Sequence, residues 1–171
     1  MSALALLLPL ASGPAVGVHT LRADDSVLRL AAESGFSHVV QLLSWQEVEP
    51  APGELYWEYP DWLVRACQHY GLALVLRLDH PPAWALRPGE SPPVDLDSYA
   101  AFVEQVASRY RGRVRAYIIW NEPNLAHEWA GQPPDAYGYA RLLQAGAEAV
   151  RRADPAALVV AAGLAPTNQK D

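Results

Sequence analysis

The chain has 171 residues and a formal net charge of -6, with 13 lysine and arginine residues against 19 aspartate and glutamate residues. This length is enough for one domain with a sizeable core, and the acidic balance argues against nucleic acid or an anionic membrane surface as a partner. A single cysteine, Cys67, excludes an intrachain disulfide, and its helical spacing from Leu63 and Tyr70 predicts a buried packing thiol.

Residues 1–13 form an apolar segment without a positively charged start. Its apolar run, from Ala3 to Leu10, is too short to cross a membrane as a stable helix. The segment fits either a weak secretory signal or a lead-in to the domain, so the sequence leaves a secreted and a cytoplasmic location open. The folded domain is expected to span residues 14–171.

The first predicted unit is a short apolar strand at residues 16–19, with His19 at its polar end. An acidic or serine residue at positions 24–26 caps the helix that follows, and Gly35 ends it. One strand and one helix are therefore complete by about residue 35.

The second unit begins with an apolar strand at residues 36–43. The loop that follows, residues 44–59, is long and rich in aromatic and acidic side chains, and such loops are often functional. Pro60 fits the first turn of the next helix, which Gly71 ends.

The third strand is predicted at residues 72–78. Arg77 and Asp79 share one parity, so they face the same side of the sheet, and His80 follows them. This pair could line a polar site or form a structural ion pair, and the sequence leaves both open. The next helix is expected to begin near Asp97, as its cap, and to run to about Tyr110.

The fourth strand is an apolar, β-branched run that begins at Tyr117 and stops at Asn121, Glu122 and Pro123. Adjacent residues on an ideal strand face opposite ways, so the backbone must bend if Asn121 and Glu122 are to reach one pocket. Pro123 favours that bend because the residue before a proline avoids helical geometry.

The last unit is a helix opened by Asp135 and ended near Asp154, followed by a strand at residues 157–162. Five strands that alternate with four helices predict an α/β fold with a parallel sheet and right-handed crossovers. An open doubly wound sheet would give the same alternation. The barrel is favoured because no glycine-rich phosphate loop follows the first strand.

The pentapeptide Trp120-Asn121-Glu122-Pro123-Asn124 resembles the acid/base strand of the clan A glycoside hydrolases. Flanking segments are similar to the corresponding parts of the family 39-like and family 5-like branches of that clan: 45–50 with Gly53 and Tyr56-Trp57, 71–76, 82–85 and 109–114. The resemblance covers residues 14–166. It implies a partial (β/α)8 TIM barrel, with the first five strands and four intervening helices, because a complete barrel typically needs about 250 residues.

The resemblance implies a hydrolase of O-glycosyl bonds with a retaining mechanism, in which two carboxyl groups lie about 5–5.5 Å apart. Glu122 would be the general acid/base, and Asn121 would hydrogen-bond the sugar hydroxyl beside the reacting carbon. The clan's nucleophile is a glutamate at the end of the seventh strand, and the sequence has no such strand. Glu47, Asp79, Asp95 and Glu128 do not occupy a corresponding position, so the chain is expected to be the inactive N-terminal portion of a hydrolase.

Further candidates lie at predicted strand ends. Clan members often place substrate contacts where His19 and His80 stand. The rings of Trp45, Trp84, Trp120 and Trp129 could stack on sugars or pack in loops, and for each ring alone the two alternatives are equal. No second histidine stands at ligand spacing from His19 or His80, so neither a metal site nor a cofactor is expected.

The expected partner is an oligo- or polysaccharide, and the sequence does not indicate which sugar, which linkage, or an endo or exo mode. A non-catalytic carbohydrate-binding relic and an unrelated α/β binding domain stay open as alternatives. A partial barrel would also leave strand edges unpaired, which predicts self-association or marginal stability.

Overall fold

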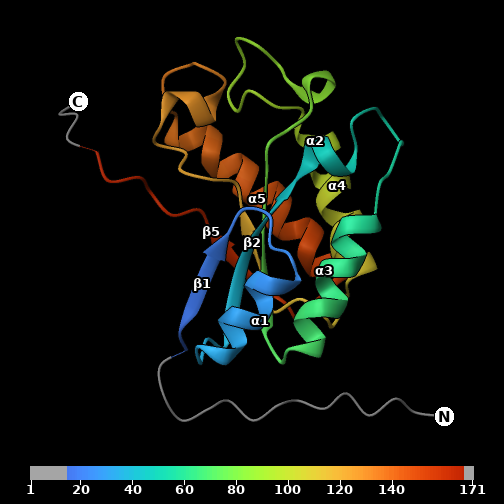
Figure 1. Cartoon of the computed structure of the whole chain (residues 1–171). Coiled ribbons are helices and arrows are strands. Elements are labelled where there is room, and N and C mark those ends of the chain that lie inside the picture. The colour runs from blue at the N-terminus through green and yellow to red at the C-terminus, as the bar shows by residue number, and fades with distance from the viewer. Residues whose placement is uncertain (1–14, 168–171) are drawn as a thin grey trace.

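The computed structural model describes residues 15–167, so the apolar segment at 1–13 lies outside the described residues. Figure 1 shows one sheet with helices packed along it. The elements, in chain order, are β1 (Gly17–Thr20), α1 (Asp25–Glu33), β2 (His38–Ser44), α2 (Trp45–Val48), α3 (Glu58–His69), β3 (Ala73–Asp79), η1 (Ala83–Ala85), α4 (Leu96–Arg109), β4 (Ala116–Ile119), η2 (Ala126–Trp129), α5 (Ala136–Ala153) and β5 (Leu158–Ala161).

The five strands form a single parallel sheet in the order β1-β2-β3-β4-β5. Each strand pairs only with the strand before and after it in the chain. A doubly wound sheet reverses its order about the first strand, whereas a β/α barrel adds strands in sequence. The order therefore confirms the predicted partial barrel and excludes the doubly wound alternative.

The core lies between the sheet and its helices. On β3, Leu74, Leu76 and Leu78 are buried, and they share one parity, as expected where every second side chain faces one side of a strand. Gly146 of α5 lies against Ile119 of β4 so closely that an added Cβ would meet the Ile119 side chain at 3.0 Å. The helices therefore cover one face of the sheet at close range.

The opposite face of the sheet is less covered. Val40 and Val75 are half-buried there, and on β5 Leu158 and Val160 are 52% and 39% exposed. Within the described residues, β1 and β5 each pair with one strand only. This face, which would be the inside of a closed barrel, carries exposed apolar side chains on β5 and is partly open.

Two predicted boundaries are corrected. Asp95, and not Asp97, caps α4, because the Asp95 carboxylate accepts the backbone N–H of Ser98 at 2.8 Å; Asp97 lies within the first turn. The loop after β2 is not irregular at its start, since residues 45–48 form the short helix α2. Within residues 15–167, no helix has both the length and the apolar composition needed to cross a membrane.

Candidate active site

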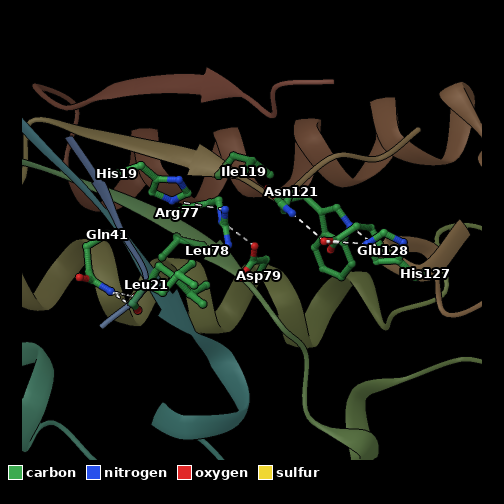
Figure 2. Close-up of polar contacts among 12 residues, drawn as sticks. His19, Leu21, Gln41, Arg77, Leu78, Asp79, Ile119, Asn121, His127 and Glu128 are labelled. Atoms are coloured by element: carbon green, nitrogen blue, oxygen red, sulfur yellow. Dashed lines mark hydrogen bonds and ion pairs between the residues drawn. The ribbon is translucent and has the colours of Figure 1, made fainter. Parts of the chain in front are cut away.

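The carboxyl ends of parallel strands meet at one edge of the sheet, and this edge carries most of the expected polar residues. Figure 2 shows His19, Arg77, Asp79, Asn121 and Glu128 in a row across it. They come from β1, from β3 and from the segment that follows β4. The sheet therefore gathers side chains that are separated by up to about 100 positions in the sequence.

The chain bends sharply where β4 ends. Trp120 and Glu122 have φ angles of +73° and +33°, in the left-handed region that costs a non-glycine residue about 1–3 kcal/mol. The backbone N–H of Leu125 donates to the Glu122 carbonyl at 2.9 Å, and the Trp120 indole N–H donates to the Glu128 carbonyl at 3.0 Å. These bonds hold the expected bend, and both Asn121 and Glu122 are half-buried beside it.

A group of polar side chains forms between this bend and η2. The side-chain amide of Asn121 donates to Glu128 Oε1 at 2.6 Å, and His127 Nε2 lies 3.6 Å from the same oxygen. One ligand atom each from Glu122, His127 and Glu128 lies within 4.8 Å of the others. His127 was not among the predicted site residues, and Glu128 was considered only as a nucleophile, although a His-Glu pair shortly after Glu122 was a signal for such a group.

Arg77 and Asp79 form an ion pair, with 2.7 Å between Nε and Oδ2. The contact is not aligned as a hydrogen bond, so both carboxylate oxygens of Asp79 are buried without a hydrogen-bond partner among the described residues. Burial raises the pKa of Asp79 to about 6, against the opposing effect of the Arg77 charge. The ion-pair alternative is therefore realised, and the pair lies at the same edge as Asn121.

His19 and His80 both lie exposed at strand ends, as the sequence indicates. His19 Nε2 is 3.4 Å from a guanidinium nitrogen of Arg77. Partial burial, followed by the Arg77 charge, lowers the pKa of His19. His80 adopts a φ of +54° directly after β3, and its carbonyl accepts the backbone N–H of Gln46 at 2.9 Å.

The candidate tryptophans divide into two groups. Trp45, Trp120 and Trp129 are fully buried, and Trp45 stacks on Phe102 with 5.2 Å between ring centroids. For these three rings the packing alternative holds, because no ring face is left for a sugar. Trp84 is only half-buried and touches Trp45 edge-on at 5.3 Å, so it is the candidate that keeps exposed surface.

A separate cavity lies between the end of β2 and α3. Arg22, Glu47 and Tyr59 are among the residues that line it. Neither Asn121 nor Glu122 is among them. This cavity is therefore separate from the edge that carries Glu122.

The fold of the chain is similar to that of solved structures. No protein-family model and no curated protein matches the chain. Among solved structures, a family 39 glycoside hydrolase from Bacteroides cellulosilyticus WH2 matches with a TM-score of 0.69 and 23% identity over 87% of this chain. A GH5_18 protein from Streptomyces cattleya, solved in complex with Manb1-4GlcNAc, matches with a TM-score of 0.69 and 18% identity, also over 87% of this chain.

Xylanase 10B from Thermotoga petrophila RKU-1, solved with xylobiose, matches with a TM-score of 0.62 and 14% identity over 86% of the chain. This chain covers 32%, 44% and 49% of the lengths of these three structures. It therefore spans a third to a half of each. With its sequential parallel strands and helix-covered face, the chain has the fold of part of a (β/α)8 barrel, similar to part of the barrels of these glycoside hydrolases.

Proposed function

We propose that this chain carries the proton-donor side of a retaining hydrolase that acts on O-glycosyl bonds. The observation that supports this most is the position of Glu122, half-buried at the carboxyl end of β4, next to Asn121. In β/α barrel enzymes, catalytic residues lie at the carboxyl ends of the strands. The complexes of similar barrels with xylobiose and with Manb1-4GlcNAc favour a sugar as the partner.

In this proposal Glu122 donates its proton to the glycosidic oxygen as the bond to the sugar carbon breaks. Asn121 binds the sugar hydroxyl beside that carbon. One N–H of its amide is engaged by Glu128, which leaves Oδ1 and the second N–H for the hydroxyl. Because Glu128 fixes the amide plane, Asn121 is already oriented before the sugar arrives.

A retaining reaction needs a second carboxyl group on the opposite side of the sugar ring. Glu128 does not suit this role, because it comes from the same loop as Glu122 and its carboxylate is tied to Asn121. Asp79 is paired with Arg77 and buried. The resemblance implies a glutamate at the end of a seventh strand for this role, and no seventh strand is among the described residues.

The test is hydrolysis of aryl glycosides by the protein at its natural length, with and without Glu122→Gln. For a phenyl glycoside, whose leaving group needs a proton, we expect the rate to fall by at least about 100-fold. For a dinitrophenyl glycoside, which leaves without protonation, the loss should be much smaller. The matched control is Glu47→Gln, an exposed glutamate on α2. Equal turnover by the Glu122→Gln variant and the wild type on the phenyl glycoside would refute the assignment.

A second candidate is sugar binding without cleavage. It is favoured by His19, His80 and Trp84, which keep exposed surface at the same edge. Calorimetry of the 171-residue chain with xylo- and manno-oligosaccharides tests it. Saturable binding without released product over a long incubation would support this candidate over the first.

A further inference from the structure

Glu122, His127 and Glu128 form a compact group of possible metal ligands that the proton-donor role does not explain. Each offers one ligand atom, and the three atoms lie within 4.8 Å of one another. The group contains an imidazole as well as two carboxylates. Nothing in the proposed cleavage of a sugar requires His127, whose side chain is 72% exposed.

The ligands come from two parts of one loop. Glu122 stands at the bend after β4, whereas His127 and Glu128 stand on η2. Asn121 fixes the Glu128 carboxylate through its 2.6 Å hydrogen bond, and such a bond to a ligand carboxylate is a usual feature of metal sites. Ligand atoms on a tetrahedral zinc ion are about 3.3 Å apart, from bond lengths of 2.0–2.1 Å. Rotation of the exposed His127 ring can close the remaining distance.

A further, buried carboxylate interacts with the group. The carboxylate of Asp79 is only 1% exposed, and neither of its oxygens has a hydrogen-bond partner among the described residues. In Figure 2 Asp79 stands between Arg77 and Glu128, and the negative charge of Glu128 acts on it unfavourably. The only cation paired with Asp79 among the described residues is Arg77. A bound cation would relieve the repulsion between these buried carboxylates.

We propose that Glu122, His127 and Glu128 bind a divalent transition-metal cation of the zinc class. One imidazole and two carboxylates suit zinc, and the imidazole disfavours magnesium and calcium, which prefer oxygen ligands alone. With three protein ligands, a fourth position on the metal stays open. One consequence rests on the proposed function: a cation held by Glu122 occupies the carboxylate oxygen that has to face the glycosidic oxygen, so zinc inhibits the hydrolysis.

The test is calorimetric titration of the metal-free 171-residue chain with zinc chloride. We expect saturable uptake of one ion per chain and little uptake of magnesium chloride under the same conditions. His127→Ala should weaken zinc binding by at least about tenfold, as should Glu128→Gln. The matched control is His69→Ala, an exposed histidine at the end of α3, which should bind zinc as the wild type does.

Circular dichroism of each variant separates loss of zinc binding from loss of folding. Because His127 is exposed, His127→Ala is the substitution least able to disturb the fold. Unchanged zinc affinity in His127→Ala, or equal uptake of magnesium and zinc, would overturn the proposal. The titration needs no substrate, so its failure leaves the proton-donor role of Glu122 intact. Conversely, full activity of Glu122→Gln would refute the proton-donor role without touching the zinc titration.

Discussion

The side-chain amide of Asn121 and the carboxylate of Glu128 are joined by a 2.6 Å hydrogen bond that connects the end of β4 to η2. The Glu128 side chain is 14% exposed, so its charge is largely shielded from water. This bond and the indole N–H of Trp120, which donates to the Glu128 backbone, hold the loop against the strand. The position of Asn121 therefore depends on a residue seven places further along the chain.

Replacement of Glu128 by alanine should destabilise the fold by about 1.5–3 kcal/mol, the usual range for a hydrogen bond to a charged group. Glu128→Gln should cost less, because the glutamine oxygen can still accept from Asn121. Urea denaturation of both variants provides the measurement. The comparison is Glu47→Gln. In the wild type, Glu47 forms an ion pair with Arg22 in which both side chains are exposed, and such a pair contributes at most about 1 kcal/mol. An equal cost for Glu128→Ala and Glu47→Gln would contradict this account of the bond.

The buried Asp79 predicts an unusual pH dependence of stability. Its pKa is raised to about 6 in the folded chain, so the folded state holds this proton more tightly than the unfolded state does. The contribution of Asp79 to stability is therefore fully present below its unfolded pKa and is lost as pH rises towards 6. Asp79→Asn, which cannot ionise, should gain up to about 2 kcal/mol over the wild type between pH 4 and pH 7.

The measurement is the difference in unfolding free energy between Asp79→Asn and the wild type at pH 4, 5, 6 and 7. Taking the difference removes the opposite trend of Asp61 and Asp95, whose pKa values are lowered by their hydrogen bonds. Asp95→Asn is the matched comparison, and its difference should run the other way. A constant difference across the pH range would show that Asp79 does not titrate as described.

Replacement of Trp45 by alanine and replacement of Trp84 by alanine should differ in their effects on stability and on sugar binding. Trp45 is fully buried against Phe102, so Trp45→Ala should cost about 3–5 kcal/mol. Trp84 is half-buried, so Trp84→Ala should cost less stability and should instead weaken the binding of oligosaccharides. Thermal melts and calorimetry with a xylo-oligosaccharide measure the two effects. Undiminished sugar affinity in Trp84→Ala would remove this ring from the candidate site.

The partly open face of the sheet predicts concentration-dependent self-association of the 171-residue chain. Val160 on β5 is 39% exposed in an apolar surface beside an unpaired strand edge. A charge there, as in Val160→Lys, should shift the chain towards monomer in sedimentation experiments. Leu30→Lys is the matched control, because Leu30 is 64% exposed but lies on α1, away from this face. A wild-type chain that stays monomeric at high concentration would contradict the prediction.

Hydrophobic runs and turn residues were enough to predict the alternation of strands and helices. The five predicted strands agree with the observed ones within about two residues, because each is a short apolar run bounded by polar or glycine residues. The helix caps were harder, since Asp95 and Asp97 are both suitable caps. The choice between them depends on the backbone bond from Asp95 to Ala85, which no local pattern reveals.

The candidate site was only partly predictable. The bend at Glu122 followed from Pro123 and from the need to aim two adjacent side chains at one place. The burial of Trp45 did not follow, because it depends on Glu49, which accepts the Trp45 indole N–H at 2.8 Å and the Gly53 backbone N–H at 2.9 Å. The approach of His127 to Glu122 was not predicted either, since it results from the turn that η2 makes.

The sequential strand order also bears on how the chain is made. Every strand pairs with the one synthesised just before it, so each new strand finds its neighbour already in place as it leaves the ribosome. Among the described strands, none pairs with a strand other than its neighbours in the chain, and the loops to be closed are short in contour. The sheet can thus grow in the direction of translation, and the segment after β4 finds three earlier strands already assembled beside it.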